Sequence, residues 1–108
     1  MIAEFSINPM DSTHISRDLA SLVEILEQSG LTYRLGPMGT CVEGHWDEVL
    51  GVIRRCHQAM AGRHERVITS VLVDDRKSHP HKLAEMVRSV EEQVVGRYVP
   101  PADKDRKL

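Results

Sequence analysis

Aromatic side chains are scarce in this 108-residue chain, where tryptophan, tyrosine and phenylalanine together make up 4% of the residues. So few flat rings are too few for the stacking platforms on which single-stranded nucleic acids bind. No apolar run approaches the roughly 20 residues that a membrane-spanning helix needs. The first ten residues, MIAEFSINPM, lack the basic and long apolar regions of a secretory signal peptide. These absences favour a cytoplasmic location.

The net charge is small and cysteines are few. The formal net charge is −2, so no basic excess would attract nucleic acid or an anionic membrane. Two cysteines, Cys41 and Cys56, do not make a disulfide framework, and we expect both thiols to be reduced. The sequence has no Walker A motif, no G-x-G-x-x-G and no G-x-S-x-G, and no helix directly follows the turn GPMG to cradle a phosphate.

Four segments have the patterning of β-strands. Residues 2–8 alternate between apolar and polar side chains, and Pro9 ends the run because it lacks the N–H that a ladder needs. Residues 66–75, RVITSVLVDD, are dominated by β-branched side chains. Residues 31–35 and 38–44 also alternate around the GPMG turn, which predicts a hairpin.

Three segments have helical spacing and are predicted as helices at about 14–29, 46–60 and 81–96. Gly30 follows the first helix, where a positive φ is often required, and Asp47 and Glu48 suit the first turn of the second. The apolar stripes are Ile15, Leu19, Leu22 and Leu26; then Trp46, Val49, Leu50, Ile53, His57 and Met60; then Leu83, Met86, Val87, Val90 and Val94.

The order β-α-β-β-α-β-α predicts an α+β fold, the ferredoxin-like sandwich. Right-handed crossovers give a four-stranded antiparallel sheet of order 4-1-3-2 with two helices on one face and an additional C-terminal helix. We expect a single domain over residues 1–97 and a polar, loose tail over residues 98–108.

Strand alternation divides the sheet residues between two faces. The face expected under the helices carries Ala3, Phe5, Ile7, Tyr33, Leu35, Thr40, Val42, Val67, Val71 and Val73. The opposite face carries Ile2, Glu4, Ser6, Thr32, Arg34, Cys41, Glu43, Ile68, Ser70 and Leu72. Its apolar members would form an exposed patch of the kind that marks an interface, although scattered exposed apolar residues on a solvated face are also common.

Glu43 is the most informative residue of that mixed face. A carboxylate there needs a cationic partner or several donors once the face is covered. Arg34, across the predicted hairpin, is one candidate partner and a cationic ligand is another, and the spacing does not decide between them. Gly39 and Gly44 flank the strand, where glycine allows a ligand or another backbone to come close.

His79 and His81, preceded by Asp74 and Asp75, resemble a loose metal-binding loop. The spacing matches no established metal motif, so we expect no native metal site. Cys56 and His57 are neighbours that point about 100° apart on a helix, which disfavours a catalytic pair.

The pieces MIAEFSINP, YRLGPMGTCVEGHWDEVLGVIRRCH, RVITSVLVDDR and KLAEMVRSVEEQ together resemble the small thiamine-binding-domain family over roughly residues 1–95. The most specific block is PMGTCVEGHWDEV with the downstream RVITSVLVDDR. The resemblance implies ferredoxin-like subunits that assemble as homotetramers, each a dimer of dimers. It also implies binding of thiamine or its hydroxymethylpyrimidine moiety without catalysis, with no other cofactor.

The family's strand motif MGT-x-x-EG falls on Met38, Gly39, Thr40, Glu43 and Gly44, its first-strand serine on Ser6 and its fourth-strand hydroxyl pair on Thr69 and Ser70. Cys41 and Asn8 depart from the aliphatic residues expected at their positions. The resemblance therefore implies a ligand site made of Glu43, Ser6, Ser70, Thr40 and Met38, with a carboxylate for the charge and hydroxyls for the ring nitrogens.

Two rival hypotheses remain. The chain could be a structural or regulatory homo-oligomer without a small-molecule ligand, whose mixed sheet face serves assembly alone. It could also be an enzyme that uses the histidines and aspartates near residues 74–81.

Overall fold

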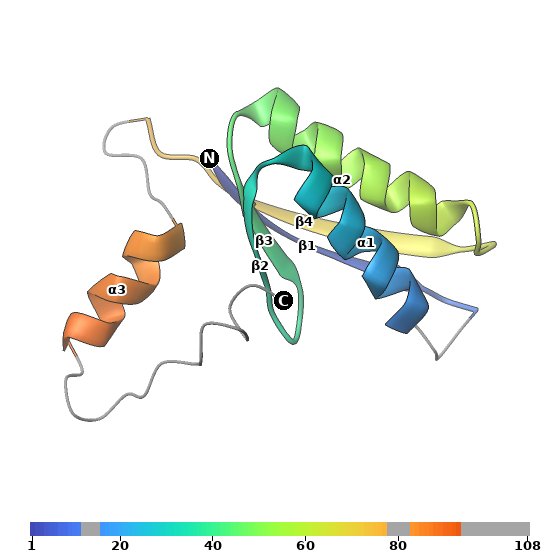
Figure 1. Ribbon diagram of the computed structural model, residues 1–108, viewed down its shortest axis with the longest axis horizontal. Helices are drawn as coiled ribbons and strands as arrows, with labels where there is room; N and C mark the ends of the chain where they lie inside the picture. The colour runs from blue at the N-terminus through green and yellow to red at the C-terminus, as the bar shows by residue number, and fades with distance from the viewer. Residues whose placement is uncertain (12–15, 78–82, 94–108) are drawn as a thin grey trace.

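The computed structural model describes residues 1–11, 16–77 and 83–93. Seven elements follow one another in the predicted order (Figure 1). They are β1 (Ile2–Pro9), α1 (Ser16–Ser29), β2 (Thr32–Leu35), β3 (Thr40–Glu43), α2 (Trp46–Ala61), β4 (Val67–Asp74) and α3 (Leu83–Gln93). Some predictions concern residues outside the described ranges. These are the first residues of α1, both ends of the predicted third helix, the His79/His81 pair and the 98–108 tail.

The four strands form one sheet in the order β2-β3-β1-β4, and every neighbouring pair is antiparallel. This confirms the predicted ferredoxin-like topology, since the order is 4-1-3-2 read from the other edge. β1 pairs with β4 along its whole length, from Ile2 to Pro9. Its pairing with β3 stops at Phe5, which faces Thr40. The second half of β1 therefore has a neighbouring strand on one side only.

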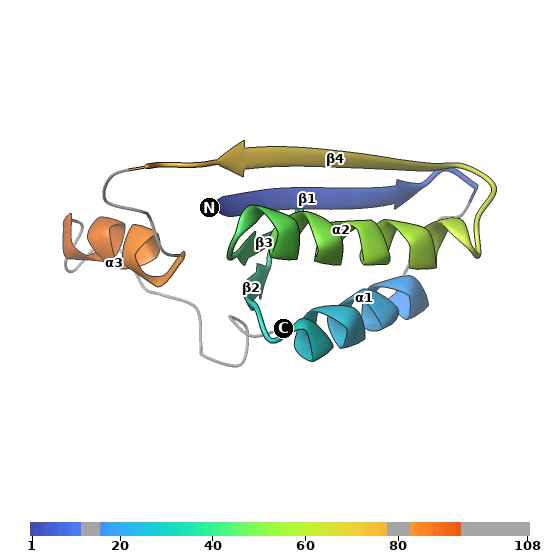
Figure 2. The same ribbon diagram turned by 90° about the horizontal axis from the view of Figure 1, so that it is seen from above.

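Helices α1 and α2 lie together on one face of the sheet, and α3 lies beyond the end of the sheet where β1 begins (Figure 2). The core fills the space between that face and the two helices. Its buried members from the sheet are Ala3, Phe5, Ile7 and Val42, and those from the helices are Leu22, Leu26, Val49, Val52, Ile53, Cys56 and Met60. Alternation in the strands and helical spacing thus meet in one apolar layer, as the sequence predicts.

Local signals at the helix ends are confirmed. Gly30, directly after α1, has a φ of 75°, which side chains other than glycine rarely tolerate. Asp47 and Glu48 occupy the first turn of α2, and the Glu48 carboxylate accepts a hydrogen bond from the His45 backbone N–H at 3.3 Å. Among the described helices, none combines the length and apolar character needed to cross a bilayer.

Two predictions about exposure are wrong. Ile2, expected in an exposed patch, is buried; it lies at the end of the sheet beyond which α3 lies (Figure 2), directly opposite Glu43, whose side chain contacts the first residue of α3. Val71, expected in the core, is 43% exposed, because β4 is an edge strand that has a neighbour on one side only. Ile68 and Leu72, the other two members of the predicted patch, are exposed.

The Glu43 side chain connects the sheet to α3. Its Oε2 accepts a hydrogen bond from the backbone N–H of Leu83 at 3.0 Å, at the first residue of that helix. A carboxylate at a helix N-terminus satisfies a donor that has no partner within the helix and interacts favourably with the dipole. Leu83 itself is buried, whereas Met86 and Val90 of α3 are exposed.

Candidate functional site

A cavity of about 350 Å³, called the main cavity below, opens at the point where β1 no longer pairs with β3. The turn between β2 and β3 encloses one side and α1 the other. Its lining combines apolar walls with a few polar groups, as small-molecule sites usually do. The lining residues are Phe5, Ser6, Ile7, Asn8, Leu19, Leu22, Leu35, Gly36, Pro37, Met38, Gly39 and Thr40.

Gly39 accounts for the shape of this cavity. A Cβ at that position would lie 3.1 Å from the Phe5 carbonyl oxygen and 3.3 Å from Glu4 Cγ. Only glycine lets the hairpin backbone approach β1 this closely, at the last residue that pairs with β3. The Gly36 N–H donates to the Gly39 carbonyl at 2.8 Å and closes the turn. The GPMG turn thus places Met38, which is 87% exposed, beside β1.

A second, smaller depression of about 130 Å³ lies beside the first and is lined partly by the same residues, Phe5, Ser6 and Met38. Ser70 of β4 faces Ser6 of β1 in the register and joins this lining. Glu4 adds a carboxylate, and Leu72 adds an exposed apolar side chain. The two depressions together bring four of the five predicted ligand-binding residues, Ser6, Ser70, Thr40 and Met38, around one corner of the sheet.

Glu4 and Cys41 form a polar pair next to this corner. The Cys41 thiol donates to Glu4 Oε2 at a sulfur–oxygen distance of 3.7 Å, and the two residues face each other in the register. Burial raises the pKa of the Cys41 thiol and the nearby Glu4 charge raises it further, while Arg34 acts in the opposite direction. A protonated thiol is a weak nucleophile, so the pair supplies a negative charge rather than a reactive sulfur.

Glu43, the fifth predicted ligand-binding residue, lies elsewhere. Its register partner is Ile2, four positions before Ser6 along β1, which corresponds to about 13 Å of strand. Its carboxylate is directed to α3, and no ion pair in the described ranges joins it to Arg34. Within one chain the structure therefore separates Glu43 from the other four residues.

The described residues hold no group of three or more histidine, cysteine, aspartate or glutamate side chains arranged to bind a metal ion. His57 of α2 contacts the Thr69 hydroxyl at 2.5 Å through Nδ1, so that threonine is engaged on the helix side of the sheet. His79 and His81 lie outside the described residues.

Sequence reasoning placed Glu4 on the mixed face and singled out Asn8 as unusual, but it assigned neither to the site. Glu4 could have been found from the strand alternation, because it shares a face with Ser6 two positions on. Asn8 could not, because its position in the cavity depends on β3 being shorter than β1. The residue pattern of a strand does not reveal at which residue its pairing with a neighbouring strand ends.

Comparison with known proteins adds a family to this geometry. The profile of the family described as thiamine-binding protein matches residues 3–91. A UPF0045 protein of Methanothermobacter thermautotrophicus is 33% identical over 97 residues, covering 85% of this chain and 97% of the relative. The UPF0045 protein YqgV of Bacillus subtilis is 32% identical over 97 residues, covering 82% and 92%.

Solved structures give the same fold. A domain of unknown function from Bacillus cereus is 30% identical, with a TM-score of 0.74 over 85% of this chain and 90% of that one. A hypothetical protein of Methanocaldococcus jannaschii is 26% identical, with a TM-score of 0.77 over 84% and 95%. A candidate thiamine biosynthesis or salvage protein of Thermotoga maritima is 18% identical, with a TM-score of 0.70 over 82% and 96%, a likeness of fold alone.

Proposed function

Because this chain belongs to the thiamine-binding protein family, we propose that it binds thiamine or a hydroxymethylpyrimidine relative without transforming it. The observation that supports this most is the gathering of Ser6, Met38 and Thr40 around a single cavity of about 350 Å³. That volume lies at the lower end of the range of roughly 300–1,000 Å³ that is usual for small-molecule sites. The name given to the similar fold from Thermotoga maritima also fits a role in thiamine supply.

The chemistry of the cavity suits an aminopyrimidine ring. Leu22 and Leu35 offer apolar contact to its faces, and the Met38 thioether can pack against an aromatic edge. Hydroxyls both donate and accept, so Ser6 and Thr40 can serve the ring nitrogens and the exocyclic amine. The walls then exclude water while a few polar groups fix the orientation.

The positive charge of the thiazolium ring needs an opposite charge close to the cavity. Glu4 lines the adjoining depression, which shares Ser6 and Met38 with the main cavity. We assign the cationic end of thiamine to this side, where the carboxylate provides an opposite charge. Glu43 is a second proposed contact, which would require assembly to bring the carboxylate of another subunit to the ligand.

A cytoplasmic homotetramer is part of the same proposal. Leu72 is 72% exposed and Ile68 is 43% exposed on the sheet face that α1 and α2 leave uncovered. Exposed apolar residues on the same face of an edge strand favour an interface. The same observation supports the second candidate, a structural or regulatory homo-oligomer that binds no small molecule.

Calorimetry decides between the two candidates. We expect the intact oligomer to bind thiamine or hydroxymethylpyrimidine, and Thr40→Ala to weaken binding roughly fivefold, since one hydrogen bond contributes about 1 kcal/mol. Thr32→Ala is the matched control, because Thr32 lies on β2 outside the main cavity. No heat of binding at millimolar concentrations of either compound would leave the assembly role alone.

A further inference from the structure

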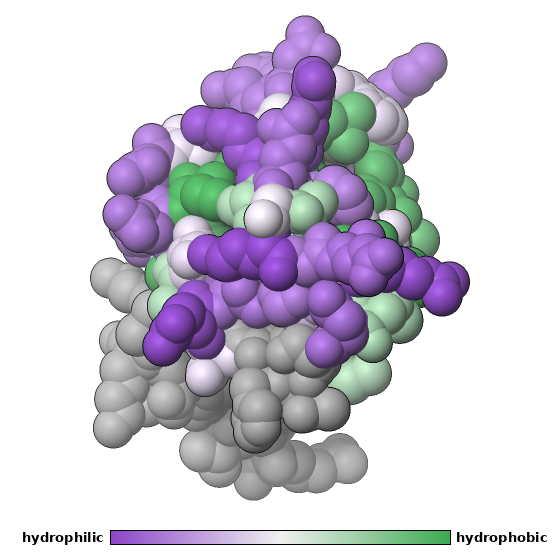
Figure 3. All heavy atoms as spheres, turned by 90° about the vertical axis from the view of Figure 1, so that its right-hand side faces the viewer, coloured by the Kyte–Doolittle hydropathy of each residue, from purple (hydrophilic) through white to green (hydrophobic). Residues whose placement is uncertain are grey.

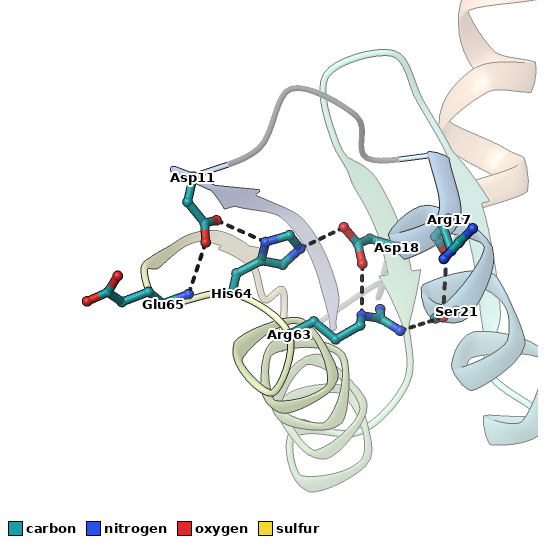
Figure 4. Close-up of polar contacts among 7 residues, drawn as sticks. All are labelled: Asp11, Arg17, Asp18, Ser21, Arg63, His64 and Glu65. Carbon is teal, nitrogen blue, oxygen red and sulfur yellow. Dashed lines mark hydrogen bonds and ion pairs between the residues drawn. The ribbon is translucent and has the colours of Figure 1, made fainter.

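His64 lies in the turn between α2 and β4, and its ring is held between two carboxylates (Figure 4). Its Nδ1 is 2.9 Å from Asp11 Oδ1, and its Nε2 is 2.8 Å from Asp18 Oδ2. Asp11 follows the end of β1, and Asp18 belongs to the first turn of α1. One imidazole therefore connects three segments that are far apart in the sequence.

Hydrogen-bond chemistry fixes the protonation of this ring. A neutral imidazole has one donor and one acceptor, whereas ionised carboxylates only accept. Both contacts are satisfied together only when the two ring nitrogens carry protons, that is, in the imidazolium form. With one proton removed, a ring nitrogen lone pair would face a carboxylate oxygen across less than 3 Å.

Other donors also contact both carboxylates. Arg63 Nε lies 2.8 Å from Asp18 Oδ1, and its Nη1 donates to the Ser21 hydroxyl at 3.1 Å. The Glu65 backbone N–H donates to Asp11 Oδ2 at 3.2 Å, and this hydrogen bond is the first cause that lowers the pKa of Asp11. A proton on the carboxyl oxygen that faces a neutral ring would weaken these contacts, because a neutral acid accepts hydrogen bonds less strongly than a carboxylate.

Among the described residues, the charged groups around His64 come from the end of β1, from α1 and from the α2–β4 turn. Asp11 and Asp18 face the ring directly, Arg63 shares the Asp18 carboxylate, and Figure 4 shows the Glu65 side chain directed away. The hydrogen bond to Asp18 is the first cause that raises the pKa of His64; burial opposes it, and Asp11 adds to it.

Asp18 is the one buried polar or charged side chain among the described residues. It precedes Leu19 directly and Leu22 by one helical turn, and both of these line the main cavity. The surrounding end of the molecule is largely hydrophilic (Figure 3). The cluster therefore holds the N-terminal part of α1 in place through charge and hydrogen bonds, within reach of solvent protons.

We propose that His64 is a protonation-dependent clasp, which as imidazolium ties the first turn of α1 to the end of β1 and to the α2–β4 turn. Loss of its proton leaves one of the two carboxylates without its donor, which weakens the tie between α1, the end of β1 and the α2–β4 turn and shifts the wall of the cavity that Leu19 and Leu22 form. The consequence for a ligand rests on the proposed function, whereas the consequence for α1 does not.

The direction of the pH effect follows from linkage. The pKa of His64 is raised in the folded chain above the usual value of about 6.5. The contribution of the clasp to stability is therefore complete below about pH 6.5. It is lost as the pH rises through the folded-state pKa.

The experiment follows the His64 ring by NMR and the urea midpoint of the full chain between pH 5.5 and 8.5. We expect the His64 resonances to titrate at a higher pH than 6.5 and the urea midpoint to fall across the same interval. His64→Gln should flatten that fall, while the control Glu65→Gln, which changes only an exposed side chain, should retain it. A titration of the His64 ring with its midpoint at or below pH 6.5 would overturn the clasp.

Asp11→Asn provides a second test if His64→Gln does not fold. It removes one of the two carboxylates at an exposed position, so the His64 midpoint should move to lower pH. If the pH midpoint of the His64 titration is the same in Asp11→Asn as in the unsubstituted chain, the proposal is contradicted. Titrations with thiamine at pH 6 and pH 8 distinguish failure of the proposed thiamine binding from failure of the proposed coupling between the clasp and the cavity. No binding at either pH counts against thiamine as the ligand. Equal affinity at both pH values counts against the coupling.

Discussion

Single residues decide the charge at the candidate site. Glu4, rather than Glu43, is the carboxylate that lies beside Ser6, Ser70 and Met38 within one chain. Its contact with the Cys41 thiol gives a way to observe it directly, because the charge of Glu4 raises the pKa of that thiol. The reactivity of the thiol therefore reports on the electrostatics of the depression.

Glu4→Gln should increase the reaction rate of Cys41 with a thiol reagent at pH 8 by a few-fold. The amide removes the negative charge, so the Cys41 pKa falls and the thiolate fraction rises. Cys56 is buried and burial raises its pKa to about 11, so only one of the two thiols reacts rapidly in the native chain. A rate that stays the same or falls would show that Glu4 does not control this thiol.

At the scale of elements, the cavity exists because β3 and β1 differ in length and because the hairpin turn approaches β1 at Gly39. Sequence patterns predicted every strand and helix in order, since alternation and helical spacing are local properties. They did not predict the burial of Ile2 or the exposure of Val71, because both depend on what lies next to a strand end or a sheet edge.

The candidate site was also predictable only in part. Ser6, Ser70, Thr40 and Met38 could be nominated from the resemblance, and the structure brings them to one corner. The direction of Glu43 toward Leu83 could not be predicted, because it depends on where α3 docks, and chain spacing does not determine that. The His64 cluster joins residues 46 and 53 positions apart, beyond any local pattern.

Gly39→Ala tests the role of the hairpin approach. The added Cβ would meet the Phe5 carbonyl at 3.1 Å, a backbone atom that can move little. We expect a loss of about 1–3 kcal/mol in the free energy of unfolding and weaker thiamine binding. Gly51→Ala is the matched control in α2, where the Cβ meets nothing within 4 Å and alanine should stabilise the helix by about 0.5–1 kcal/mol. Equal effects of the two substitutions would contradict the account.

At the scale of the whole molecule, the sheet face opposite α1 and α2 carries exposed Leu72 and Ile68 beside the polar depression. Assembly through this face would bury the apolar side chains and shelter Glu4 and Ser70 from water at the same time. The proposed tetramer and the proposed site would then depend on each other.

Leu72→Glu should reduce the proposed tetramer to smaller species, observed by size-exclusion chromatography with light scattering. A charge buried without a partner strongly disfavours an interface, whereas the same change on solvent-exposed surface has little effect. Leu50→Glu on α2 is the control, because Leu50 is also partly exposed but lies outside the sheet. Tetramers that persist in Leu72→Glu, or a chain that is monomeric without any substitution, would remove this face from the assembly.

The most direct test of the central claim is a titration of the isotopically labelled chain with thiamine, followed through its backbone amide resonances. The account predicts the largest shifts at Ser6, Asn8, Gly39 and Thr40, around the main cavity. It predicts small shifts at Thr32 and Tyr33, which line a separate cavity of about 310 Å³ beside α1. The largest shifts at that separate cavity, or no shifts at all at saturating thiamine, would contradict it.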